Sequence, residues 1–169
     1  MCRLSEVYRL ARPEDAEEVL RIIRGAYASL ERLGIEFRAV HADLAMVRDN
    51  IIHHSCFVLF QGDAMTATIS LRSLEEVTEY PFLYWFAVDP LVNGRGVGTK
   101  LLTFAEETVV RDTMGAPAVT LATSLKHPWL LPMYERRGYE RFYERELGKD
   151  DKLVFLSKRL LPEAQTILS

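Results

Sequence analysis

The sequence lacks several features that would place it in a specialised class of protein. Only two of its 169 residues are cysteines, Cys2 and Cys56, and they show no metal-ligand spacing. A disulfide framework is thereby excluded, and we expect no metal site. Positive charge is not in excess either, because 21 Lys and Arg stand against 24 Asp and Glu, a formal net charge of −3. This balance gives no general attraction to nucleic acid, and we predict no such partner.

Long apolar runs and repeats are missing as well. No segment approaches the ~20 apolar residues of a membrane span, and the first residues hold no apolar run typical of a signal peptide. We therefore expect a cytoplasmic protein without membrane contact. Because no linker, repeat or low-complexity tract is visible, we predict one domain over residues 1–169, long enough to bury about 70% of the surface of the unfolded chain.

What the sequence does contain is a series of strand and helix patterns. Strands are predicted over residues 7–11, 55–60, 64–73, 82–88, 118–123, 139–146 and 152–160. Helical periodicity marks a segment that starts at Pro13 and ends before Gly34, a second over 40–51, a third that ends at Gly115 and a short one over 129–137. The order predicts a mixed α/β (α+β) fold. Residues 31–38, between the first two helices, are of the kind that can cover a site.

A glycine-rich loop, residues 93–98, connects the apolar strand 82–88 to the third helix. Its glycines at positions 94, 96 and 98 allow backbone N–H groups to converge without Cβ atoms in the way. The helix that follows offers unsatisfied N–H groups and the positive end of its dipole. This pattern predicts an anion, most simply a phosphate, as the guest of the loop.

Two common phosphate-binding loops do not fit. A dinucleotide-binding loop would have a glycine in place of Thr99 and an acidic residue at the end of the next strand, where Thr123 and Ser124 stand. An ATP- or GTP-binding loop needs the order Gly-Lys-Ser/Thr, whereas residues 98–100 read Gly-Thr-Lys. Nucleotide binding through either loop is therefore disfavoured.

The loop resembles the pyrophosphate loop of the Gcn5-related N-acetyltransferases, the GNAT superfamily. The family pattern is Gln/Arg-x-x-Gly-x-Gly/Ala, and Asn93 stands where glutamine or arginine is usual. A second signature of the family, a tyrosine followed by a charged pair, glycine and an aromatic residue, is similar to residues 133–139, Met-Tyr-Glu-Arg-Arg-Gly-Tyr. Residues 84–90 also look like its fourth strand. The resemblance implies a mostly antiparallel sheet of about seven strands with about four flanking helices, splayed between strands 4 and 5.

The resemblance implies acetyl-CoA as the cofactor, with CoA as the product. Backbone N–H groups of residues 93–99 would hold its pyrophosphate, with Arg95 and Lys100 as supplementary charges. The backbone N–H of Phe86 would polarise the thioester carbonyl, and Val88 would pair with pantetheine amides. The implied cofactor-binding residues are Phe86, Ala87, Val88, Asn93, Gly94, Arg95, Gly96, Val97, Gly98, Thr99, His127 and Tyr134.

Two tyrosines are the candidate catalytic residues. By resemblance, Tyr134 would donate a proton to the leaving thiolate. The strand position that holds a glutamate base in many relatives is Phe82 here, so Tyr84, on the same face, is a candidate for ordering a water. Further candidate bases are the carboxylates Glu31, Glu36, Asp43 and Glu79.

Two other features leave alternatives open. His127 stands where many relatives have a cofactor-binding asparagine, and it could contact pantetheine or cap the helix that follows. The aromatic residues of strand 82–88 could be core or could line an acceptor pocket; we favour core for Phe82 and Trp85 and leave Tyr84 open.

The predicted function is acetyl-CoA-dependent N-acetyl transfer to a primary amine of an unidentified small molecule or peptide, by direct attack. Neither cysteine lies in a nucleophile motif, which favours direct transfer. The alternative is an inactive acyl-CoA-binding sensor or structural module, because Phe82 and His127 depart from the family pattern. A homodimer is a further option, since dimers are common in the family.

Overall fold

The computed structural model describes residues 5–32, 34–35, 41–92 and 94–161. Seven strands form one sheet in the order β1-β2-β3-β4-β5-β7-β6. Their bounds are β1 (Glu6–Leu10), β2 (Ser55–Gln61), β3 (Ala64–Arg72), β4 (Phe82–Val88), β5 (Ala118–Ser124), β6 (Glu140–Glu146) and β7 (Lys152–Arg159). The main helices are α1 (Ala16–Arg32), α2 (Leu44–His53), α3 (Val97–Thr103) and α4 (Leu130–Arg136). The predicted fold class is confirmed.

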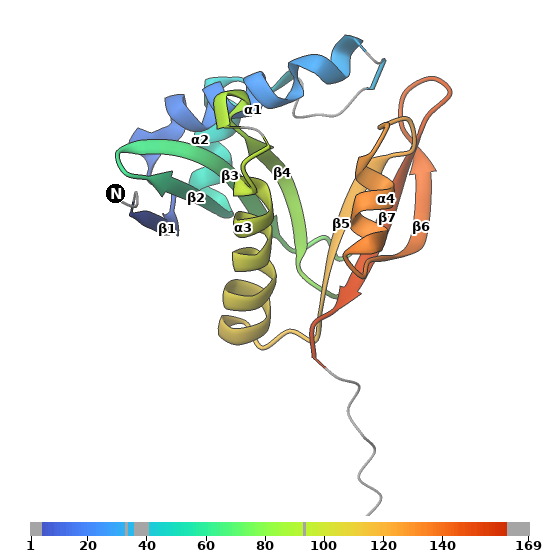
Figure 1. Ribbon diagram of the computed structural model, residues 1–169. Helices are drawn as coiled ribbons and strands as arrows, with labels where there is room; N and C mark the ends of the chain where they lie inside the picture. The colour runs from blue at the N-terminus through green and yellow to red at the C-terminus, as the bar shows by residue number, and fades with distance from the viewer. Residues whose placement is uncertain (1–4, 33, 36–40, 93, 162–169) are drawn as a thin grey trace, which may run out of the picture.

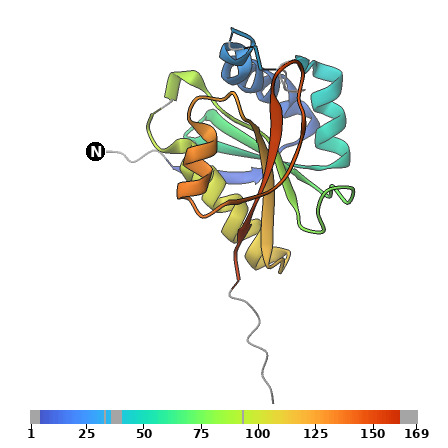
Figure 2. The ribbon, with the colours of Figure 1, turned by 90° about the vertical axis from the view of Figure 1, so that its right-hand side faces the viewer.

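Helices cover both faces of the sheet (Figures 1 and 2). One core cluster joins α3 and α4 to the sheet and includes Leu101, Leu131 and Leu156. The other joins α1 and α2 to the opposite face and includes Ile23 and Val47. Strands β4 and β5 therefore lie between two separately packed layers.

All neighbouring strands are antiparallel except β4 and β5, which are parallel. Their pairing is limited to Phe82 and Thr120. Beyond this pair the strands diverge, and in Figure 1 the β1–β4 half leans away from the half formed by β5, β7, β6 and α4. The facing edges of the two strands consequently have no strand partner over most of their length, as the predicted splay requires.

A bulge interrupts β4 where the two strands separate. Ser70 of β3 is paired with Tyr84, but Thr68 is paired with Ala87, so Trp85 and Phe86 together face Ile69. Trp85 has a positive φ of 50°, a conformation that is an outlier for a bulky residue. A β-bulge leaves one residue out of the ladder and re-aims its neighbours. Phe86 accordingly packs with the α3 core, whereas Trp85 packs with the α1 core.

Two details differ from the sequence prediction. The third helix is α-helical only to Thr103 and continues to Thr113 as the π-helical segment η4 (Phe104–Thr113). Strand β4 is half-buried at most positions, because the cleft replaces the cover that a central strand would have. Val40 and part of the predicted covering segment, residues 36–38, lie outside the described residues.

Within the described ranges, no helix combines the length and apolarity that a bilayer span requires.

Candidate active site

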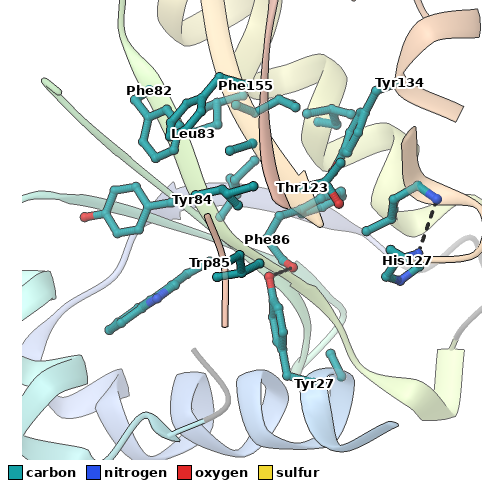
Figure 3. A pocket seen from close by; sticks show the side chains of 18 of the residues that line it. Tyr27, Phe82, Leu83, Tyr84, Trp85, Phe86, Thr123, His127, Tyr134 and Phe155 are labelled. Atoms are coloured by element: carbon teal, nitrogen blue, oxygen red, sulfur yellow. Dashed lines mark hydrogen bonds between the residues drawn. The ribbon is translucent and has the colours of Figure 1, made fainter. Parts of the chain in front are cut away.

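A cleft of about 1190 Å³ lies where β4 and β5 diverge. Its walls come from both halves of the sheet and from the helices beside them. Figure 3 shows Tyr84 and Trp85 extending to one side, while Tyr134, Thr123 and His127 lie on the other. We call the side lined by Leu102 of α3, by Thr123 and His127 and by Tyr134 of α4 the cofactor wall; the glycine loop adjoins it at the start of α3. The side formed by Arg72, Phe82, Tyr84, Trp85, Arg145 and Phe155 is called the acceptor wall.

The glycine loop lies against β4 and opens α3. Gly96 is the N-cap of α3, with φ of 76° in the left-handed region that favours glycine. Gly98 is needed for a different reason: a Cβ atom there would lie 3.0 Å from Cγ2 of Val88 and 3.3 Å from Cζ of Phe86. The loop backbone can approach β4 closely because this Cβ is missing. A cradle of bare backbone N–H groups next to an unpaired strand edge fits an extended molecule with a phosphate group.

The two basic side chains predicted to assist the loop differ in their surroundings. Arg95 is exposed at the loop. Lys100 instead forms an ion pair with Glu6, with 3.0 Å between Nζ and Oε1, and its hydrogen bond lowers the pKa of that carboxyl group. Asn93 lies outside the described residues. Val97 is buried in the core, so any part it has in an anion site is through its backbone.

The free edge of β4 is fixed from the α1 side by a residue that the sequence analysis did not select. The Tyr27 hydroxyl donates a hydrogen bond of 2.9 Å to the backbone carbonyl of Phe86. Burial raises the pKa of Tyr27, which keeps this donor protonated. In the sequence Tyr27 is one apolar-face position of a helix, and no pattern distinguishes it. Ala87 is buried beneath this edge, and Val88 packs against the α3 core.

Tyr134 lies on α4 with only 5% of its surface exposed, and its side chain lines the cleft. Among the described residues its hydroxyl has no hydrogen-bond partner. Burial raises the pKa of Tyr134, and the neighbouring Tyr27 raises it further. The hydroxyl is therefore a protonated donor that remains available to a molecule in the cleft (Figure 3).

A buried carboxylate holds α4 in this position. Glu106, 1% exposed, accepts hydrogen bonds from Arg137 at 2.9 and 3.1 Å, from the Tyr139 hydroxyl at 2.6 Å and from Lys158 at 3.2 Å. The backbone N–H of Tyr139 also donates to the carbonyl of Tyr134, at 3.0 Å. The motif of residues 133–139 is thus explained by structure: Arg137 and Tyr139 anchor the end of α4 to η4, which fixes the tyrosine at its centre.

His127 adopts the capping arrangement. Its Nδ1 accepts hydrogen bonds from the backbone N–H groups of Leu130, at 3.2 Å, and Trp129, at 3.4 Å. Burial lowers the pKa of His127, which favours the neutral ring that an acceptor Nδ1 requires. His127 also lines the cleft, so a contact with the cofactor stays a prediction.

Thr123 is a second residue of the cofactor wall that the sequence analysis did not assign to the site. Within the described part of the chain, its Oγ1 is the buried side-chain polar atom without a hydrogen-bond partner. Figure 3 shows it between Phe86 and His127, at the edge of β5 that faces the cleft. Leaving a buried hydroxyl unpaired costs about 1–3 kcal/mol, so a ligand that supplied a partner would be stabilised. The sequence offers only a threonine in an apolar strand, which is no signal.

The candidate general bases are mostly engaged elsewhere or distant. Tyr84 donates a short hydrogen bond to the Asn50 side chain, and burial raises its pKa. Asp43 caps α2 by accepting from the N–H of Met46 at 2.9 Å, and Glu79 is exposed. The side chain of Glu31 and all of Glu36 lie outside the described part of the structure. Tyr84 still lines the cleft, and its role as a water-ordering residue stays a prediction.

The aromatic residues of β4 are not simply core, as the sequence suggested for Phe82 and Trp85. Both are half-buried and line the cleft, together with Tyr84. The bulge accounts for this, because it leaves side chains of β4 over the opening between the strands. Ionisable residues from distant segments line the same opening, and no motif in the sequence indicated them: His41, Arg72, Glu76, Arg145 and Glu146.

A glycine loop against a splayed pair of parallel strands, with a buried tyrosine opposite, defines a CoA-dependent acyltransferase of the kind expected. The profile of the Acetyltransferase (GNAT) family matches residues 19–139, well over half of the chain. The chain belongs to this family and is an acyltransferase of the N-acetyltransferase type.

Two relatives from Bacillus subtilis (strain 168) match over almost the whole chain. The S-(2-succino)cysteine N-acetyltransferase is 46% identical over 157 residues, which cover 90% of this chain and 95% of the relative. The S-alkylcysteine N-acetyltransferase is 44% identical over 164 residues, covering 94% and 91%.

Solved structures confirm the fold at much lower identity. The ribosomal-protein-S18-alanine N-acetyltransferase of Escherichia coli is 16% identical with a TM-score of 0.76, covering 98% of this chain and 100% of that one. The PaiA N-acetyltransferase of Thermoplasma acidophilum, solved in complex with coenzyme A, is 15% identical with a TM-score of 0.71, covering 92% and 99%.

Proposed function

We propose that this enzyme transfers the acetyl group of acetyl-CoA to the primary amine of a small molecule of the cysteine S-conjugate type, by direct attack of the amine. The observation that carries the proposal is Tyr134, a buried residue whose protonated hydroxyl has no hydrogen-bond partner among the described residues and lines the cleft between β4 and β5.

The cofactor wall is suited to bind an extended phosphate-bearing molecule. The N–H groups of the loop that ends at Gly98 would hold the pyrophosphate, and the edge of β4 up to Val88 would pair with pantetheine amides as another strand would. Pairing of β4 with β5 ends at Phe82, so these backbone groups have no competing strand partner. Thr123 and His127 also line the cofactor wall and would limit how the chain of the cofactor lies.

Acetyl-CoA supplies an activated acyl group on a thiol leaving group. The residues of the chain would position the amine and manage the protons. Tyr27 holds the carbonyl of Phe86 and so fixes the backbone around the N–H that would polarise the thioester. Tyr134, kept protonated by burial, would give its proton to the departing sulfur. The amine would release one proton to solvent as the amide bond forms and the C–S bond breaks, and Tyr134 would regain a proton from solvent, so that transfer ends with an amide, a neutral thiol and a neutral tyrosine.

The missing glutamate at Phe82 is compatible with this chemistry when the acceptor is an α-amine. An α-amino group has a pKa of about 8, whereas a lysine-type amine has one of about 10.4. A far larger fraction of an α-amine is therefore neutral near pH 8, and transfer needs less help from a base. The departure from the family pattern favours amino-acid acceptors over lysine side chains and polyamines.

The relatives support the same acceptor class, because both are named for N-acetylation of cysteine S-conjugates. The acceptor wall adds to this, since Phe82, Tyr84 and Trp85 offer an apolar surface on which a sulfur substituent could lie.

The test is release of CoA thiol from acetyl-CoA with S-alkylcysteines, Nα-acetyl-lysine, spermidine and a peptide with a free N-terminus, with the product mass measured in each case. We expect turnover with S-alkylcysteines and a kcat/KM at least about tenfold lower for Nα-acetyl-lysine and spermidine. Acetyl-CoA binding without a product from any acceptor would support the alternative of an inactive acyl-CoA sensor. Preferential turnover of the peptide or spermidine would overturn the acceptor class alone.

A further inference from the structure

Two arginines of the acceptor wall have guanidinium groups without a carboxylate partner in the described part of the chain. Arg72 ends β3 and Arg145 lies near the end of β6, and both line the cleft. Within the described ranges neither takes part in an ion pair, although Glu76 and Glu146 line the same cleft. A cation without an anion at the rim of a cavity is available to an anionic group of a ligand.

The register of the sheet gives the position of each arginine along the strand direction, which we call its height in the cleft. The pair Phe82 and Thr120 sets β4 and β5 level, so Ser124, four residues beyond Thr120, is level with Phe86. Ser124 pairs with Leu153, and Leu153 pairs with Arg145. Arg145 therefore lies at the same end of the cleft as Phe86, where the thioester is proposed to lie, but on the far half of the sheet.

Arg72 lies at the other end of the acceptor wall. It pairs with Phe82, four residues before Phe86 along β4. At about 3.3 Å per residue, this places the two arginines at heights that differ by roughly 13 Å. Its charge still reaches Tyr84, whose pKa it lowers against the effect of burial.

Aromatic rings occupy the space between these two heights. Phe82 stacks on Tyr84 with 6.2 Å between ring centroids, and it contacts Phe155 of β7 at 5.9 Å. Figure 3 shows Phe82 and Phe155 beside each other across the gap between the two halves of the sheet. The guanidinium of Arg145 lies over Phe155, with Cζ 5.1 Å from the ring centroid. This cation–π contact restrains the guanidinium while its N–H donors stay free for an anion.

We propose that Arg145 binds the α-carboxylate of the acceptor, and that the sulfur substituent lies along Phe82 and Tyr84 towards Arg72. This inference rests on the proposed function. With the carboxylate on Arg145, at the same end of the cleft as Phe86, the α-amine would face across the cleft towards the thioester. Arg72 then favours an acidic group at the end of the substituent, whereas the rings between the arginines accept apolar ones.

The test compares kcat/KM for four acceptors: S-benzylcysteine, S-carboxyethylcysteine and the α-carboxamide of each. For the wild type we expect each acid to exceed its amide by roughly ten- to a hundredfold, the usual loss when a charge-assisted pair is removed. In Arg145→Gln this ratio should fall to about threefold or less, through KM for the acceptor, with KM for acetyl-CoA unchanged. Arg145→Lys keeps the charge and should retain part of the ratio.

Two further variants complete the design. Arg72→Gln should keep the acid-to-amide ratio but lose the preference for S-carboxyethylcysteine over S-benzylcysteine. Arg159→Gln, which removes an exposed arginine at the end of β7, is the matched control and should change neither ratio. A thermal melt of each variant shows that it is folded.

The outcomes separate the two proposals. Equal turnover of acids and amides by the wild type, or an unchanged ratio in Arg145→Gln, overturns the carboxylate site while the acetyltransferase reaction stands. If the wild type acetylates none of the four compounds, the proposed acceptor class fails and the inference fails with it. If Arg145→Gln does not fold, the acid-to-amide ratios of the wild type and of Arg145→Lys still test the carboxylate site. Loss of the ratio in the lysine variant, which keeps the charge, would contradict a role for charge.

Discussion

The two walls of the cleft are built in different ways. The cofactor wall comes from short segments, namely the α4 segment with Tyr134 and the residues from Thr123 to His127, and the adjoining glycine loop offers backbone groups. The acceptor wall is made of side chains from β3, β4, β6 and β7, more than 70 residues apart between Arg72 and Arg145. A ligand shared by a whole family can be held by backbone geometry, whereas an acceptor that differs between relatives is recognised by side chains on strands that the sheet brings together.

Replacing Tyr134 with phenylalanine should produce the largest change on the cofactor wall. Without the proton donor, we expect kcat to fall about a hundredfold or more, since general acid catalysis contributes about 10²–10⁴. Acetyl-CoA affinity, measured by calorimetry, should stay within about threefold, because the ring remains. Burial raises the pKa of Tyr134, so the kcat of the wild type should show no loss from this group as pH rises to 9.

Tyr139→Phe is the matched control for that measurement. It also removes a buried tyrosine hydroxyl, but one that donates to Glu106 and lies outside the cleft lining. Its kcat should be nearly unchanged. An equal loss of kcat in both variants would show that packing of α4, and not proton donation, limits the rate.

Glu106→Gln should be the variant that most reduces stability. The substitution leaves Arg137 and Lys158 without their anion in a mostly buried site, and we expect the free energy of unfolding to fall by about 3 kcal/mol. Urea unfolding followed by tryptophan fluorescence measures this. Glu135→Gln removes a carboxylate from an exposed ion pair with Arg141 and should leave stability nearly unchanged. Similar losses in both would mean that the buried cluster does not anchor α4.

Gly96→Val should weaken acetyl-CoA binding by about tenfold or more. A β-branched residue is strained by at least about 1–2 kcal/mol at the positive φ of this N-cap, so the N–H groups of the loop would move to relieve it. Gly115→Val imposes the same strain, at φ of 68°, beyond the other end of the same helix. Only the first should raise the Kd for acetyl-CoA, measured by calorimetry. Undiminished affinity in Gly96→Val would remove the loop from the cofactor wall.

The contrast between the cofactor wall and the acceptor wall also explains how much of the structure could be predicted from the sequence. The order of strands and helices followed from apolar periodicity, and the loop and Tyr134 followed from motifs within short segments, so the fold and the candidate cofactor wall were accessible. The β4 bulge was not, because it depends on how β3 and β4 pair. The proposed role of Arg145 depends on its pairing with Leu153 and on its contact with the ring of Phe155, and neither contact can be inferred before the sheet is known.

His127→Asn should give the smallest effect, a change in how Tm depends on pH. Burial lowers the pKa of His127 in the folded state, so the unfolded chain binds the proton more readily. Above the unfolded-state pKa of about 6.5 this group does not alter stability, and below it the free energy of unfolding falls as pH decreases. Protonation of Nδ1 also removes the acceptor for the N–H of Leu130, and a lost N-cap costs about 1 kcal/mol, or roughly 2–4 °C in Tm. Asparagine caps a helix without titrating, so between pH 7.5 and 5.0 the Tm of the wild type should fall further than that of the variant. Parallel Tm curves would show that His127 does not couple the end of α4 to pH.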